Sequence, residues 1–145
     1  MAYPQTYAIR QTFSREREPD VRGAVEREFR RLQPSCAVRP GARVGITVGS
    51  RGIRNIAALA RATVDCLKSI GARPFIFPAM GSHAGGTAEG QRSVLHHYGV
   101  TEEAMGCPIL SSMAAVEIGR SQEGLPVFLD QHASEADHVV VLNRV

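Results

Sequence analysis

Two glycine-rich loops contain the side chains best suited to chemistry. The first reads Gly49-Ser50-Arg51-Gly52, and the second runs from Gly81 to Thr87. Glycines let backbone N–H groups approach a ligand closely, and a helix that follows such a loop favours an anion at its N-terminus. The Arg51 guanidinium has the planar fork that matches a carboxylate or a phosphate. The first loop therefore predicts an anion site, and a plain turn remains its structural alternative. Neither loop has the spacing of a Walker or dinucleotide-binding motif.

His83 is the chemically distinctive residue of the second loop, where it lies among glycines beside Ser82. Because a histidine side chain titrates near neutral pH, this position suits general acid–base chemistry. The alternative is a surface histidine that bonds a loop carbonyl. Thr87 has a structural role as the N-cap of the next helix.

No set of metal ligands appears in the sequence. Cys36, Cys66 and Cys107 are far apart, and the histidines lack the spacing of a metal motif. We expect Cys66 to be a small core residue, and His96 and His97 to lie on a helix surface. The absence of paired carboxylates and of ligand clusters argues against a redox or metal-hydrolase domain.

The two loops fall within an alternating pattern of strands and helices, which is typical of a parallel α/β unit. Asn55 is the expected N-cap of the first helix in this unit, and the two helices are expected to end at Gly71 and Gly99. Its predicted elements are a strand at Arg43–Val48, a helix from Asn55 through Ile70, a strand at Pro74–Pro78 and a helix at Ala88–Tyr98.

Further elements are predicted on both sides of this unit. On the N-terminal side we expect a half-buried strand at Tyr7–Phe13 and a helix that is capped by Asp20, runs to about Leu32 and is stopped by Pro34. On the C-terminal side we expect a short turn capped by Thr101, strands at Val116–Gly119 and Pro126–Leu129, a short helix at His132–Asp137 and a strand at His138–Leu142. The Val-Val-Val of the last strand is typical of a central strand.

Composition and charge restrict the class of protein. The 145 residues suit one α/β domain, 1–145, with 43% apolar and 21% charged residues, as in a globular protein. Neither a membrane span nor a secretory signal is recognisable, so we expect a cytoplasmic protein without a membrane partner. Residues 1–54 hold eleven basic and five acidic side chains, which favours an anionic partner. Arginines 22–31 alternate with glutamates as on a solvated helix. The one aromatic among them, Phe29, belongs to the apolar face of the predicted helix, so the run has no stacking aromatics and does not indicate nucleic acid.

At the two loops the sequence resembles the lactate racemase family, the nickel-pincer-dependent racemases and epimerases of 2-hydroxy acids. The resemblance covers roughly residues 40–145, and its motifs are Thr47–Gly52, Pro78–Gly90 and Val139–Val145. It is closer to an uncharacterised branch than to lactate racemase itself. It implies a three-layer, mostly parallel sheet flanked by helices, as the N-terminal domain of a two-domain enzyme that can also form a homo-oligomer.

The resemblance also implies roles for individual residues. His83 matches an acid–base histidine of the family, and Arg51, with Ser50, matches the site that orients the substrate carboxylate. The cofactor of the family is a nickel-bearing pyridinium bisthiocarboxylate mononucleotide. The residues expected to contact it are Gly49, Gly52, Gly81, Ser82 and Thr87. The partners implied are a small 2-hydroxy acid and the second domain.

The family's nickel-binding histidine and cofactor-tethering lysine are expected further along a longer chain, which would continue with Lys-Pro-His. Lys68 does not match that lysine. The chain is therefore expected to be truncated, to hold no metal or cofactor alone and to be inactive alone. The different reading that stays open is a non-catalytic module that binds an anion or a nucleotide phosphate through both loops.

Overall fold

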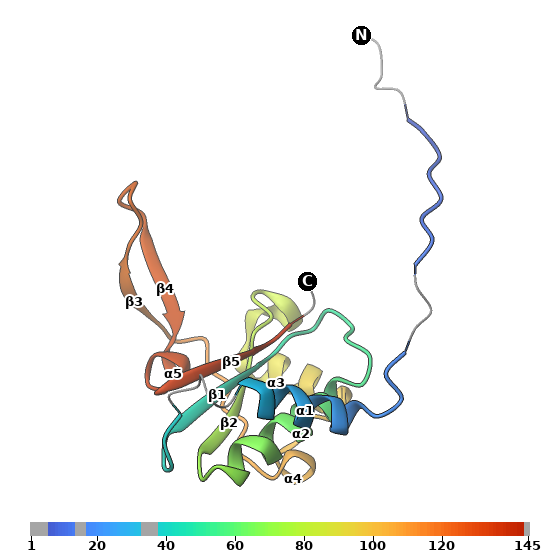
Figure 1. Ribbon diagram of the computed structural model, residues 1–145. Coiled ribbons are helices and arrows are strands. Elements are labelled where there is room, and N and C mark those ends of the chain that lie inside the picture. The colour runs from blue at the N-terminus through green and yellow to red at the C-terminus, as the bar shows by residue number, and fades with distance from the viewer. Residues whose placement is uncertain (1–5, 14–16, 33–37, 144–145) are drawn as a thin grey trace.

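Three parallel strands form the centre of the protein. The computed structural model describes residues 6–13, 17–32 and 38–143, and Figure 1 shows their arrangement. The strands are β1 (Arg43–Val48), β2 (Arg73–Pro78) and β5 (His138–Leu142). Their order in the sheet is β2-β1-β5, and both pairings are parallel and in register. The sequence prediction for β1 is confirmed residue for residue.

The long helices pack on one face of this sheet. They are α1 (Val21–Leu32), α2 (Ile56–Ser69) and α3 (Ala88–His97), followed by the short α4 (Glu102–Met105). The fully buried core joins alternate residues of the strands to residues of these helices: Val44, Ile46, Val48, Ile76, Val64, Leu67 and Leu95. The structure therefore confirms an α/β fold with a parallel sheet flanked by helices.

The other face of the sheet has a thinner cover. Phe75 and Phe77 lie on it, with ring centroids 6.0 Å apart. A side chain at Gly45 would collide with both rings, so this glycine lets them lie across β1. Ala133, from the short helix α5 (Gln131–Ser134), packs against the pair. Because the long helices all share the opposite face, the expected three-layer arrangement is present only in part.

A two-stranded hairpin stands away from the body of the protein (Figure 1). It consists of β3 (Ala115–Arg120) and β4 (Pro126–Asp130), which pair antiparallel as a separate sheet. Both strands and the turn between them were predictable from alternation and from the glycine of the turn. Large apolar side chains such as Ile118 are exposed on this hairpin.

The capping signals are confirmed at most helix ends. Asp20 Oδ1 accepts a hydrogen bond from the backbone N–H of Gly23 at 2.9 Å, and Thr101 Oγ1 accepts one from Ala104 at 3.1 Å. Gly71 and Gly99 adopt the left-handed conformation that ends a helix. The prediction for Asn55 is wrong in its detail. Asn55 precedes α2 with φ of 61°, and its side chain makes no capping hydrogen bond.

Two predictions for strands require correction. Tyr7–Phe13 is not part of a sheet, and Tyr7, Ile9 and Phe13 are 79%, 88% and 70% exposed. β5 forms an edge of the sheet and not its centre, so Val141 is 68% exposed. An alternating or apolar pattern reports a preference for burial but not whether a neighbouring strand is present. The expected helix stop at Pro34 lies outside the described residues.

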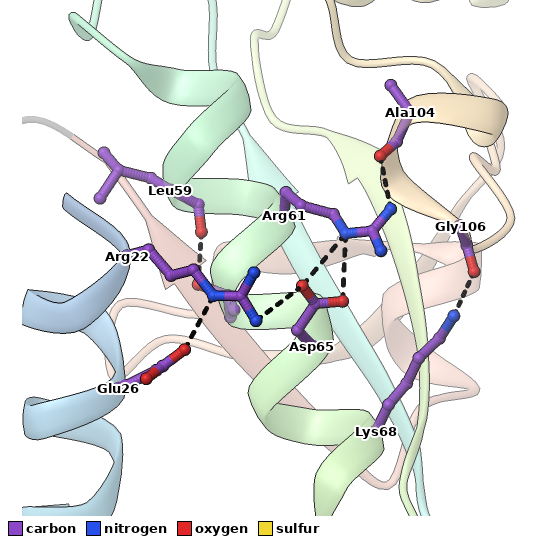
Figure 2. A network of polar contacts seen from close by, with 9 residues as sticks. Arg22, Glu26, Leu59, Arg61, Asp65, Lys68, Ala104 and Gly106 are labelled. Atoms are coloured by element: carbon purple, nitrogen blue, oxygen red, sulfur yellow. Dashed lines mark hydrogen bonds and ion pairs between the residues drawn. The ribbon is translucent and has the colours of Figure 1, made fainter. Parts of the chain in front are cut away.

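An ion pair joins α1 to α2, and hydrogen bonds join α2 to α4 and the residue that follows it (Figure 2). Arg22 of α1 lies 3.8 Å from the Asp65 carboxylate, which also accepts a hydrogen bond from Arg61 at 3.0 Å. Arg61 donates to the carbonyl of Ala104 at 2.8 Å, and Lys68 donates to the carbonyl of Gly106. Within α1, Arg22 and Arg31 pair with neighbouring glutamates, as predicted for a solvated helix.

The described cysteines are core residues without redox partners. Cys66 and Cys107 are buried and free, which confirms the prediction for Cys66, and Cys36 lies outside the described residues. Burial raises the pKa of both thiols. Among the described helices, none combines the length and the apolar character that a membrane crossing requires.

Two isoleucines with opposite burial test the assignment of the core. Ile46 is fully buried in β1, whereas Ile118 is 56% exposed on the hairpin. Ile46→Ala should lower the free energy of unfolding by about 2–5 kcal/mol, because it removes buried methyl groups and leaves a cavity. Ile118→Ala, which deletes the same atoms, should cost less than about 1 kcal/mol. Urea denaturation measures both, and equal losses would contradict this core.

Candidate functional site

A pocket forms where the three parallel strands end. Val48, Pro78 and Leu142 are register partners at the carboxyl ends of β1, β2 and β5. Both glycine-rich loops begin just after these residues, at the sheet edge where α/β proteins bind ligands. The pocket has a volume of about 360 Å³. It is lined by Gly49, Ser50, Arg51, Ala79, Met80, Gly81, Ser82, His83 and Asn143.

Hydrogen bonds hold the two loops against each other. The backbone N–H of Ala79 donates to the carbonyl of Val48 at 2.9 Å, which extends the pairing of β1 and β2 into the loops. The Tyr98 hydroxyl, at the end of α3, donates to the carbonyl of Ser50 at 2.9 Å. The Ser50 hydroxyl lies 3.0 Å from His83 Nδ1, so the first loop contacts the histidine of the second.

The surroundings of His83 favour one tautomer of its ring. Nδ1 lies 2.8 Å from the carbonyl oxygen of Met80. A carbonyl oxygen can only accept, so Nδ1 must carry the hydrogen of this bond. The neutral imidazole then has its lone pair on Nε2, which none of the described residues bonds. His83 therefore does bond a loop carbonyl, as its structural alternative predicts, yet this bond leaves Nε2 able to act as a base.

Arg51 brings a cation to the rim of the same pocket. Its side chain is exposed, and no described residue accepts a hydrogen bond from its guanidinium or forms an ion pair with it. Most other arginines of the described chain differ in this respect. Arg61, for example, is held by Asp65 and by the carbonyl of Ala104. Arg51 can therefore turn its fork toward an anion in the pocket.

The backbone of the second loop is unusual and fixes its shape. Ala84, Gly85 and Gly86 are successive left-handed residues, with φ of 54°, 73° and 62°. Gly81 is left-handed too, and Gln91, a buried residue of α3, donates to its carbonyl at 2.6 Å. Left-handed alanine costs about 1–2 kcal/mol, so the surrounding contacts must stabilise this turn.

Thr87 and Gly90 explain how the loop joins α3. Thr87 Oγ1 accepts a hydrogen bond from the backbone N–H of Gly90 at 3.1 Å, which confirms the predicted N-cap. A Cβ atom at Gly90 would lie 2.2 Å from the carbonyl oxygen of Ala84. Only glycine at this position lets α3 approach the loop so closely.

The pocket unites most, but not all, of the predicted site residues. Six of them line it: Gly49, Ser50, Arg51, Gly81, Ser82 and His83. Gly52 and Thr87 are not among its lining residues. The sequence analysis did not identify Met80, Tyr98 and Gln91. The Met80 carbonyl accepts a hydrogen bond from His83, the Tyr98 hydroxyl donates one to Ser50, and the Gln91 side-chain amide donates one to Gly81. Asn143 lines the pocket too, and the sequence indicated this only because Asn143 directly follows the predicted last strand.

The described residues do not by themselves make a site for nickel. His83 is the single imidazole of the pocket, and no described group of three or more His, Cys, Asp or Glu side chains could hold a metal ion. Lys68, the chain's one lysine, bonds Gly106 near the C-terminal end of α2. That end lies opposite the pocket, because α2 runs back across the sheet. The pocket therefore offers a cation for an anionic ligand and an imidazole as proton acceptor. Its described residues do not supply the ligands or the tether of the metal cofactor.

Comparisons with family models, with curated proteins and with solved structures give no match for this chain.

Replacement of Gly90 tests the coupling between α3 and the loop. Gly90→Ala should lower the free energy of unfolding by about 1–3 kcal/mol, because the new methyl group collides with the Ala84 carbonyl. Ser93→Ala, at an exposed position of the same helix, is the matched control and should change stability by less than about 0.5 kcal/mol. Thermal denaturation measures both variants. A Gly90→Ala protein as stable as the control would contradict the close approach.

Proposed function

We propose that this domain binds a small 2-hydroxy acid in the pocket at the carboxyl ends of its strands. Arg51 holds the carboxylate, and His83 exchanges a proton with the hydroxyl group. The observation that carries the proposal is the meeting of two loops, distant in sequence, in one pocket. It joins a guanidinium that no described residue pairs with to an imidazole whose contacts favour a free Nε2. A carboxylate beside a hydroxyl group is the ligand chemistry that these two side chains complement.

The carboxylate is the anchor of the proposed ligand. A guanidinium can donate two parallel hydrogen bonds to it, which fixes both the position and the plane of the carboxylate. Backbone N–H groups of the glycine-rich loops add donors at the same edge of the sheet. With the carboxylate fixed, the hydroxyl on the neighbouring carbon has few places left, and a pocket of about 360 Å³ has room for such a molecule.

His83 supplies the proton acceptor. In the neutral ring Nδ1–H donates to Met80, so Nε2 takes the proton from the substrate hydroxyl and can return it. Ser50, 3.0 Å from Nδ1, limits rotation of the ring. The chain's own residues thereby account for binding, orientation and movement of the hydroxyl proton.

Within this proposal, the chain is the N-terminal, substrate-binding part of a nickel-pincer-dependent racemase or epimerase. The support for that identity is the resemblance of the two loops. The cofactor would act on the hydrogen of the alpha carbon, and the described residues do not supply a set of ligands for its metal.

Binding of lactate to paired arginine variants tests the anchor. Arg51→Gln should weaken binding about 10–100-fold, because a charge-assisted hydrogen bond contributes about 1.5–3 kcal/mol. Arg54→Gln removes the same charge three residues away, outside the pocket, and should leave the affinity nearly unchanged. Isothermal titration calorimetry measures both. Equal effects of the two variants would mean that only net charge matters, and the anchor would be wrong.

A comparison of lactate with propionate, which lacks the hydroxyl, tests the role of His83. The wild-type chain should prefer lactate about 2–10-fold, the range of one neutral hydrogen bond. His83→Ala should abolish this preference, whereas Arg51→Gln should weaken both ligands alike. The alternative of a phosphate-binding module predicts tight binding of inorganic phosphate, no preference for lactate and no effect of His83→Ala.

The purified chain should not racemise lactate or malate, even when the nickel cofactor is supplied. Its pocket offers one imidazole, and the chain's one lysine, Lys68, lies away from that pocket on the carbonyl of Gly106. Chiral chromatography of the products measures this directly. Turnover by these 145 residues would show that the assignment of nickel ligands and tether to other residues is wrong.

A further inference from the structure

β5 has an unprotected outer edge. It pairs with β1 on one side, and no described residue pairs with its other side. The opposite edge of the sheet differs, because Ile76 of β2 exchanges backbone hydrogen bonds with the segment around Ile109. Open edges with apolar side chains are templates for a further strand, and proteins usually protect them with charges or proline. β5, with the sequence His-Val-Val-Val-Leu, has neither.

Apolar surface continues on both faces of this edge. On the helix face, an apolar groove of about 410 Å³ separates β5 from α1, with walls formed by Val25, Phe29, Val140 and Leu142 among others. On the other face, Val139 and Val141 are 43% and 68% exposed. A strand added to β5 would place alternate side chains in the groove and beside these valines.

The chain contains a segment with the pattern of such a strand. Residues 7–13 are extended and belong to no sheet of the described chain. Tyr7, Ile9, Gln11 and Phe13 occupy alternate positions, with Ala8, Arg10 and Thr12 between them, and the three large apolar side chains are 70–88% exposed. This alternation is typical of a strand with one buried face. Within the described residues the outer edge of β5 has no partner strand, and this segment has the pattern of one.

The way in which the segment leaves the body favours a second copy as the recipient. Glu18 accepts a hydrogen bond from the backbone N–H of Asp20 at 2.9 Å and pairs with Arg27 of α1 at 3.2 Å. With Asp20 also capping α1, residues 18–20 are fixed on the first turns of the helix. Figure 1 shows the blue segment 6–13 beyond this point, directed away from the sheet. It covers no part of its own β5.

We propose that Tyr7–Phe13 of one copy adds as a strand to the outer edge of β5 in a second copy, and that the exchange is reciprocal. The sheet of each copy then has four strands. Each copy gives its segment to the other and receives one on its own β5, so the dimer is closed and has two-fold symmetry. Buried aromatic side chains cover roughly 150–250 Å² each, and two rings with Ile9 from both copies approach the roughly 1,200–2,000 Å² of a stable interface. The inference does not depend on the proposed function.

Light scattering coupled to gel filtration tests the exchange on the full chain. The wild type should be a dimer. Ile9→Arg and Val141→Arg should each give a folded monomer, because both positions are exposed in the single copy and charge opposes burial in the seam. One control adds the same charge outside the seam: Ile118→Arg, on the exposed face of the hairpin, should remain a dimer.

Mixing the two monomeric variants separates strand exchange from other dimers. An Ile9→Arg copy has an intact β5 edge, and a Val141→Arg copy has an intact segment. The mixture should therefore dimerise more tightly than either variant alone, through one intact seam. A mixture no tighter than its components would overturn the proposal.

Hydrogen exchange of the β5 amides, read together with the oligomeric state, distinguishes docking of Tyr7–Phe13 on its own β5 from docking on the β5 of a second copy. A wild-type chain that is monomeric at all concentrations would overturn the proposal. If Ile9→Arg then also speeds exchange in β5, the segment docks on its own sheet. A dimer that persists in both Ile9→Arg and Val141→Arg uses another surface, and this result would also overturn the proposal. The same holds if Ile118→Arg dissociates the dimer. Circular dichroism of each variant verifies that the fold is retained.

Discussion

Parallel pairing of β1 with both of its neighbours is the constraint on which the site depends. Because β2 and β5 run in the same direction as β1 and in matched register, their carboxyl ends meet at one edge. Loops that are more than thirty residues apart in sequence then face each other, and Ser50 comes within 3.0 Å of His83. An antiparallel neighbour would send one loop to the opposite edge and separate the guanidinium from the imidazole.

The buried face of the sheet and the site are linked through α3. The helix packs Leu95 into the core, places Gln91 on the carbonyl of Gly81 and ends with the Tyr98 hydroxyl on the carbonyl of Ser50. Both functional loops are thus held by one helix that is itself fixed by apolar burial. This support allows a strained left-handed turn at Ala84 to persist beside His83.

Much of this arrangement could be read from local sequence, and the rest depended on contacts. The β-branched run of β1, the cap at Asp20 and the glycine ends of α2 and α3 carry strong local signals, and each was predictable. The hydrogen bond that His83 donates to Met80 ends on a backbone carbonyl, so no residue type predicts it. Burial of Tyr7–Phe13 and of β5 depends on a neighbouring strand, which alternation cannot specify. Asn55 matched a capping residue by type, but its left-handed backbone keeps the side chain from the helix N-terminus.

The central claim is that His83 offers Nε2 to the hydroxyl of a ligand anchored at Arg51. Nitrogen NMR of the histidine rings, recorded with and without lactate, tests it most directly. Neutral His83 should carry its hydrogen on Nδ1, and saturating lactate should shift the Nε2 resonance, with no such shift in an Arg51→Gln chain. A neutral ring protonated on Nε2, or a His83 spectrum unchanged by bound lactate, would contradict it.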